Sequence, residues 1–97
     1  MTIEIRQEDE GQRGRYRLLV DDADAGEVTY RMQDGNRVFV HTEVHEDFEG
    51  QGLAGKLAEH VLDAARREGI LIVPQCPYIR GYIERHPEYQ DLVATPS

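Results

Sequence analysis

The spacing of the apolar residues changes once along this chain, and this change constrains the fold more than any other feature of the sequence. From residue 3 to residue 45 apolar and polar residues alternate, which is the two-residue period of β-strands. From residue 53 to residue 65 the apolar residues recur every three or four positions, as in a helix that buries one face. The sequence therefore predicts an α/β fold in which several strands come first and a helix then covers them.

Four strands are predicted before the period changes. Polar or glycine-containing turns at 8–14, 21–26 and 34–36 separate them, and the fourth strand runs from Val38 to His45. Strands joined by such short turns pair in antiparallel fashion. Under strict alternation one face of the fourth strand carries Val38, Val40, Thr42 and Val44, and the other carries Phe39, His41, Glu43 and His45.

One more strand and one more helix are predicted after the long helix. Gly69 suits the left-handed residue that ends a helix, and Ile70–Val73 has the composition of a buried strand. A strand, a helix and a strand in this order imply that the last two strands run parallel. Pro77 suits the first turn of a helix from Tyr78 to about residue 86. The expectation is a single α/β domain over residues 1–97, with four antiparallel strands, a crossover helix, a parallel fifth strand and a short C-terminal helix.

Charge and length exclude several classes of function. Eleven Lys and Arg residues against nineteen Asp and Glu give a net charge of -8, which argues against a nucleic-acid partner. Such a charge favours a cationic or amine-bearing partner, although it also serves simply to keep a small protein soluble. The chain has no apolar run long enough to cross a membrane and no signal-peptide pattern at its N-terminus, so we expect a cytoplasmic protein.

A glycine-rich turn precedes the long helix, over residues 48–55. Gly50 and Gly52 allow a ligand to approach the backbone closely, and the first N–H groups of a helix attract anions. No Lys-Ser or Lys-Thr pair follows the turn, so it is not a P-loop. The turn is either a cradle for a phosphate group or simply a tight connection between strand and helix.

These residues resemble a known family. Gly50–Ala54 resembles the loop with which the GCN5-related N-acetyltransferases bind the pyrophosphate of acyl-CoA, whose usual form is Gln/Arg-x-x-Gly-x-Gly/Ala. Gly52 and Ala54 match that form. Together with the loop, the segments His41–Val44, Pro74–Tyr78 and Tyr82–Tyr89 look like the short YjdJ-type acetyltransferase-like subfamily.

The resemblance implies where acetyl-CoA would bind. It implies that the fourth and fifth strands splay apart and that the backbone from Thr42 to Val44 lies beside the pantetheine arm and the acetyl carbonyl. It also assigns the pyrophosphate to the backbone of the turn, namely to Gly50, Gln51, Gly52, Leu53, Ala54 and Gly55. One departure is Glu49, which occupies the position usually held by Gln or Arg and would repel phosphate. A second is the segment 8–14, which is too short for the helices that hold the acceptor in ordinary members.

Three side chains are candidates for catalysis. Cys76 follows the fifth strand, where a thiol would lie near the thioester as nucleophile or acid, although free cysteines are often simply buried. Glu43 and His41 are candidate bases for deprotonating an ammonium group, although His41 could instead serve as a structural hydrogen-bonding residue. Four scattered histidines and one cysteine do not have the spacing of zinc ligands, so no metal is expected.

The function expected from the resemblance is transfer of an acetyl group from acetyl-CoA to an amine, either a small amine or an exposed amine on a protein. Two alternatives stay open. One is a module that binds CoA or acyl-CoA without catalysis, and the other is a protein-interaction domain in which the glycine turn binds nothing. The protein is expected to be a monomer or a homodimer, because a half-open sheet leaves edges that could pair.

Overall fold

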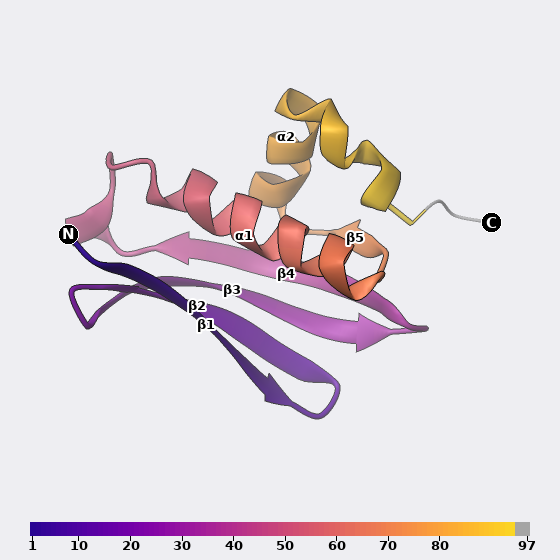
Figure 1. Cartoon of the computed structure of the whole chain (residues 1–97), viewed down its shortest axis with the longest axis horizontal. Helices are drawn as coiled ribbons and strands as arrows, with labels where there is room; N and C mark the ends of the chain where they lie inside the picture. The colour runs from indigo at the N-terminus through magenta and orange to yellow at the C-terminus, as the bar shows by residue number, and fades with distance from the viewer. Residues whose placement is uncertain (95–97) are drawn as a thin grey trace.

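The computed structural model describes residues 1–94 and contains one five-stranded sheet whose strands lie side by side in chain order (Figure 1). The first four strands pair antiparallel and the fifth runs parallel to the fourth, as predicted. The strands are β1 (Ile3–Glu10), β2 (Arg13–Val20), β3 (Ala23–Gln33), β4 (Asn36–Val44) and β5 (Ile72–Pro74). The helices are α1 (Leu53–Glu68) and α2 (Pro77–Arg85), with the short 3-10 helices η1 (Glu46–Phe48) and η2 (Pro87–Leu92).

The turns between the first strands are shorter than the sequence predicts. Only residues 11 and 12 separate β1 from β2, and only Asp21 and Asp22 separate β2 from β3. Gly11, Asp21 and Asp22 all have positive φ angles, which lets a two-residue turn follow the twist of the strands it joins. Most of the polar residues that the sequence predicts to form turns, at 8–14 and 21–26, therefore belong to the paired strands. They can do so because a strand with one face in water accepts charged side chains.

Both α-helices pack on the same face of the sheet (Figure 1). Leu57, Val61 and Leu62 of α1 are fully buried against Tyr16 and Phe39 of the sheet. Gly69 has φ 69° and its N–H bonds the carbonyls of Ala65 and Arg66, so it ends α1 as predicted. Within residues 1–94, neither helix combines the length and the apolar character needed to cross a lipid bilayer.

The prediction of strict alternation along β4 is wrong because of a β-bulge. Thr29 lies opposite His41 and Tyr30 opposite Phe39, so Val40 is an extra residue on β4. The extra residue changes which side chains face the helices: Phe39 is buried in the core and Val40 is 41% exposed. Thr42 and Val44 then return to the helix side.

Beside the bulge, β4 and β5 separate. Their pairing is limited to Arg37, Val38 and Phe39 of β4, and the N–H of Cys76 makes a last bond of 2.9 Å to the carbonyl of Phe39. Beyond this point the edge of β4 has no strand beside it among residues 1–94. The fold thus contains the splay that the family resemblance implies.

Candidate functional site at the splay of β4 and α1

A cavity of about 310 Å³ lies between the end of β4 and the start of α1. This is the lower end of the size range of small-molecule sites, roughly 300–1,000 Å³. Most of its lining comes from residues that the sequence assigned to acetyl-CoA. The lining residues are Thr42, Val44, Phe48, Glu49, Gly50, Gly52, Leu53, Ala54, Gly55 and Tyr78.

The first turn of α1 presents free donors at this cavity. The first bond within the helix runs from the N–H of Lys56 to the carbonyl of Gly52, at 3.3 Å, so the N–H groups of Leu53, Ala54 and Gly55 precede it. Gly52 caps the helix without a side chain, and the first turn contains no acidic residue. The positive end of the helix dipole and these N–H groups together favour an anion.

The glycines of the turn leave this end of the helix open. Gly50 and Gly52 have φ angles of 80° and 72°, which residues with a Cβ adopt at a cost. A Cβ added to either would have no atom within 4 Å. A group as broad as a phosphate therefore has room beside the backbone. Glu49 also lines this cavity and is exposed. Its negatively charged carboxylate would repel a phosphate bound there, so this residue disfavours an anionic ligand.

The edge of β4 supplies a second set of backbone groups. The N–H of His45 donates to the carbonyl of Ala25 on β3, at 2.8 Å. Because successive residues of a strand point their polar groups to opposite sides, the N–H and C=O groups of Thr42 and Val44 point away from β3. They point to the side that β5 has left, and an extended amide-containing chain could pair with them there.

Cys76 lies behind the cavity wall. It caps the N-terminus of α2, is 3% exposed, and its thiol donates to the hydroxyl of Thr42 with a sulfur–oxygen distance of 3.1 Å. Thr42 itself lines the cavity, so the hydroxyl of Thr42 lies between the thiol of Cys76 and the cavity. The structure thus brings together two of the residues singled out in the sequence, Cys76 and Thr42.

The two predicted bases lie elsewhere. His41 and Glu43 flank Thr42 in β4, so they project from the opposite face of the sheet, and both are exposed. Neither lines the cavity, and neither does Gln51. Any action of His41 or Glu43 on a substrate would take place on the side of the sheet that faces away from the helices.

Sequence reasoning missed Phe48 as part of the site. Phe48 is half-buried in η1 and forms an apolar wall of the cavity, which its position two residues before Gly50 could have suggested. Tyr78 forms the wall of the cavity on the α2 side. Beside it, burial raises the pKa of Tyr82, whose ring stacks on His86 with centroids 3.9 Å apart. Within residues 1–94, no cluster of three or more His, Cys, Asp or Glu side chains could hold a metal ion.

Comparison with solved structures places this arrangement among acetyltransferases. A GCN5-like putative N-acetyltransferase from Staphylococcus aureus matches with a TM-score of 0.71 and 25% identity, over 97% of this chain and 90% of that one. A GNAT family acetyltransferase from Elizabethkingia anophelis with acetyl-CoA bound matches with a TM-score of 0.67 and 16% identity, over 90% and 74% of the two chains.

A ribosomal-protein-alanine N-acetyltransferase from Brucella melitensis biovar Abortus 2308 also matches, with a TM-score of 0.61 and 21% identity. That match covers 91% of this chain but 66% of the Brucella protein, so this chain spans just under two thirds of its length. A comparison with curated protein sequences finds no match.

The sequence itself carries the family assignment. The profile of the GCN5-related N-acetyl-transferase family matches residues 15–92, which include β3, β4, the glycine turn, both α-helices and β5. The matched region contains the whole cavity and the splay beside it. The chain therefore belongs to the GCN5-related N-acetyltransferase family.

Proposed function

We propose that this protein binds acetyl-CoA at the cavity between β4 and α1 and transfers the acetyl group to a primary amine. One observation carries the proposal: the free N–H groups at the start of α1 and the outward-pointing backbone of Thr42 and Val44 border the same cavity. The first set suits a pyrophosphate and the second suits the amide-containing pantetheine arm. The bound acetyl-CoA of the Elizabethkingia structure supports acetyl-CoA as the co-substrate.

The binding residues proposed for acetyl-CoA are those of the turn and the strand edge. The backbone from Gly50 through Gln51 to Gly55 would hold the phosphates, and Thr42 and Val44 would hold the pantetheine arm. Acetyl-CoA supplies a thioester whose acetyl carbon forms a bond to the amine nitrogen as the carbon–sulfur bond breaks and CoA leaves as a thiol. Glu43 or His41, on the far face, would accept the proton that the ammonium group loses.

Cys76 is proposed to act near the thioester, as nucleophile or as proton donor to the departing thiolate. Its hydrogen bond to Thr42 supports a position next to the cavity. Its burial supports the competing structural role equally. After exposure to acetyl-CoA, a nucleophilic Cys76 would leave one acetyl adduct that hydroxylamine removes and that C76A does not form. An unmodified protein and full turnover in C76A would assign the residue to structure alone.

We further propose that the chain is one of the short YjdJ-type members. The two-residue turn between β1 and β2 supports this, because no acceptor-binding helices fit there. The Staphylococcus protein supports it as well, since 90% of that chain is covered. The acceptor would then be a small amine or an exposed amine on a protein, because nothing between β1 and β2 encloses it.

Calorimetric titration with CoA tests the binding site. Ala54 is half-buried, lies in the first turn of α1 and lines the cavity, so A54E would add a bulky carboxylate without straining the backbone. We expect CoA binding to be lost in A54E and in G52D, and retained in G35D. Gly35 is the matched control, since it has φ 80° and equal space around it but lies in the distant β3–β4 turn. Equal affinity in folded A54E and wild type would refute the site.

Catalysis is tested separately. Labelled acetyl-CoA incubated with a panel of amines should yield acetylated product. Binding of CoA without product from any amine would favour a non-catalytic CoA-binding module. Absence of CoA binding would favour the interaction-domain alternative.

A further inference from the structure

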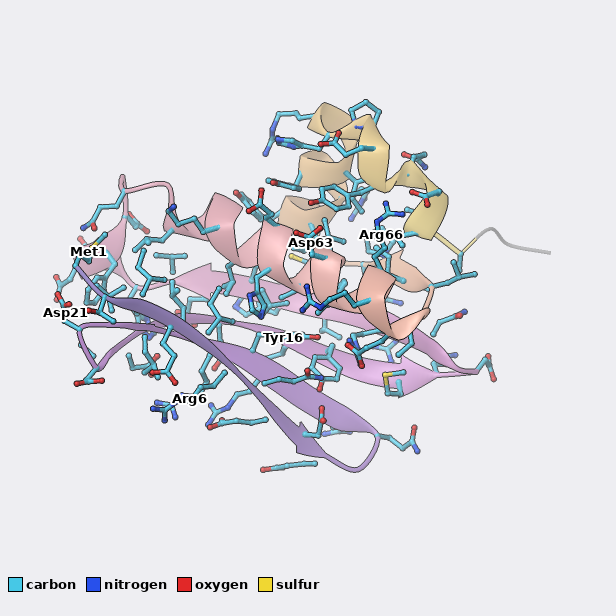
Figure 2. The ribbon with its side chains drawn as sticks, in the orientation of Figure 1. Met1, Arg6, Tyr16, Asp21, Asp63 and Arg66 are labelled. Carbon is cyan, nitrogen blue, oxygen red and sulfur yellow. The ribbon has the colours of Figure 1, made fainter. Side chains whose placement is uncertain are left out.

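The face of the sheet that faces away from the helices carries a lattice of charged side chains. In Figure 2 the side chain of Arg6 lies on this face, on the side of the sheet opposite α1 and α2. Most of its arginines are neutralised by carboxylates of the same face. The pairs are Arg6 with Glu4, Arg15 with Glu8 and Glu27, and Arg17 with Glu8.

Arg13 and Arg31 break this pattern. They lie directly opposite each other on β2 and β3, and like charges in that position destabilise a sheet. Neither forms a salt bridge with any carboxylate of residues 1–94, although Glu10 lies opposite Arg13 on β1. Two arginines on neighbouring strands that form no ion pair among the described residues can both donate to one anionic group.

A hollow of about 390 Å³ lies beside the two arginines. Thr29 contributes a hydroxyl to it, and the exposed side chain of Val40 contributes an apolar wall. Val40 points there because it is the bulged residue of β4. The lining residues are Arg13, Gly14, Thr29, Tyr30, Arg31 and Val40.

This hollow ends where β4 and β5 separate. Val40 lies between Phe39, the last residue of β4 that pairs with β5, and His41, which projects from the same open face as the hollow. Thr29 of β3 lies opposite His41. It is two residues from Arg31 on the same strand, which is about 6.6 Å along the backbone. A molecule held at Arg13 and Arg31 could therefore extend past His41 to the edge of β4, where the splay opens toward the cavity.

The far end of this path is acidic. Glu27 and Glu43 lie opposite each other on β3 and β4, just beyond His41, and both project from the open face. Glu27 is paired with Arg15, whereas Glu43 forms no ion pair with an arginine among residues 1–94 and can attract an ammonium group. The face thus has a cationic end at the hollow and an anionic end at the splay.

We propose that the hollow beside Arg13 and Arg31 is the subsite for an anionic group of the acceptor, which is therefore a small amine that also carries a carboxylate or a phosphate. This inference rests on the proposed function. It restricts the acceptors to amines that also carry an anionic group, whereas the net charge of the chain favours cationic or amine-bearing partners in general. The negative field of the protein attracts the amine, while the arginine pair selects amines that carry an anionic group a few bonds away.

Matched acceptors test the subsite. At low salt, γ-aminobutyrate and 3-aminopropylphosphonate should be acetylated with kcat/KM about tenfold above that of the neutral 4-aminobutanamide, as one charge-assisted interaction allows. R13Q and R31Q should abolish this preference. R6Q removes the same charge from the same face, outside the hollow, and should keep the preference. The ratio of the carboxylate to the phosphonate rate identifies the anionic group. An unchanged preference in R13Q and R31Q would overturn the inference.

A binding measurement that needs no catalysis separates this inference from the proposed function. Inorganic phosphate titrated into ¹⁵N-labelled protein should shift the amide signals of Thr29, Arg31 and Val40 with a dissociation constant on the order of millimolar. The shifts should persist in R6Q and vanish in R13Q and R31Q, with dispersed spectra showing that the variants are folded. If phosphate causes no saturable shifts in the wild-type protein, the proposed subsite is wrong, whether or not the protein acetylates amines. Phosphate binding without acetylation of any amine overturns the acceptor role together with the proposed function.

Discussion

Arg37 of β4 links this strand to β2 and to the C-terminal end of α1. Its side chain is almost fully buried, and it donates to the hydroxyl of Tyr16 at 2.8 Å and to both carboxylate oxygens of Glu68 at 3.0 and 3.1 Å. Figure 2 shows Tyr16 between α1 and the sheet. Burial raises the pKa of Tyr16 to about 12, so the hydroxyl stays neutral and accepts this bond. One polar atom is unsatisfied, since Arg37 Nε has no partner among the described residues.

Replacing Arg37 with Met should lower the free energy of unfolding by about 2 kcal/mol. The loss comes from the buried Tyr16 hydroxyl, which is left without its donor, and it is limited because Glu68 is 41% exposed and regains water. R6M is the control, because Arg6 and Glu4 form an exposed pair whose loss should change the free energy of unfolding much less. Urea denaturation measures both variants. Equal effects would contradict the role of Arg37 as a buried link.

His60 should make stability depend on pH between 7 and 5.5. Burial, and then the charge of Arg67, lower the pKa of His60 below its usual value of 6.5. The imidazole of His60 therefore takes up a proton at higher pH in the unfolded chain than in the folded one. Its contribution to the free energy of unfolding is fully present above about pH 6.5 and is lost as the pH falls through the lower pKa of the folded state. The carboxylate of Glu68, whose pKa is lowered mainly by its hydrogen bond to Arg37, loses its contribution only at lower pH, below about 4.5.

Denaturation of H60N at pH 7 and pH 5.5 measures this contribution. The variant should lose less stability between the two values than the wild type does. A wild-type pH dependence in H60N would show that another group is responsible.

At the scale of elements, the bulge in β4 decides how the site is built. The extra residue Val40 turns Thr42 and Val44 toward the helices and His41 and Glu43 away from them. It also coincides with the point where β4 and β5 separate. One irregularity thus gives the strand a face that lines the cavity proposed for acetyl-CoA, an open edge, and a second face that carries the proposed acceptor subsite.

The close pairing of β3 and β4 beside this region depends on Gly26. A Cβ at Gly26 would collide with the backbone of Glu43 and Val44, so G26A should push the end of β4 outward. We expect a loss of about 1–3 kcal/mol in stability, as for other overpacked sites, together with weaker CoA binding at the displaced edge. Denaturation and calorimetry measure the two effects.

The same substitution in α2 provides the control. At Gly81 an added Cβ would approach only the flexible end of Arg85, at 3.4 Å, so G81A should stabilise the helix by up to about 1 kcal/mol. If G26A were as stable as the wild type and bound CoA equally well, the edge of β4 would not depend on this contact.

At the scale of the whole molecule, the helices cover the sheet unevenly. The protein measures 42 × 31 × 21 Å, and the β1–β2 hairpin extends away from the helical layer (Figure 1). Ile3 and Ile5 of β1 are only half-buried, whereas Tyr16 and Phe39 of the inner strands are completely buried. β1 is therefore the strand with the least apolar contact among the four antiparallel strands.

Amide hydrogen exchange should reveal this gradient. Amides of β1 that are bonded to β2 should exchange at least about tenfold faster than those of β3, because opening the edge strand exposes little of the core. NMR-detected exchange near neutral pH compares the two sets residue by residue. The same protection in β1 and β3 would mean that the edge strand opens only when the whole protein unfolds.

The order and type of the elements could be predicted from the sequence because they depend on local periodicity. The switch from alternation to helical spacing, Gly69 after Arg66 and Arg67, and Pro77 at the start of α2 each act within a few residues. The glycine turn at the cavity could be predicted for the same reason, since Gly50 and Gly52 are the residues that tolerate positive φ angles. These features need no knowledge of the rest of the chain.

Only the tertiary structure decided which side chains meet. The bulge at Val40 arises from the register between β3 and β4, and no pattern within the strand marks it, so the face of His41 and Glu43 could not be assigned from alternation. The bond from Cys76 to Thr42, the Arg37 network and the facing arginines at 13 and 31 each join residues distant in sequence. Periodicity reports whether a residue is buried, whereas the partner of a buried or facing group is set by how strands pair and helices pack.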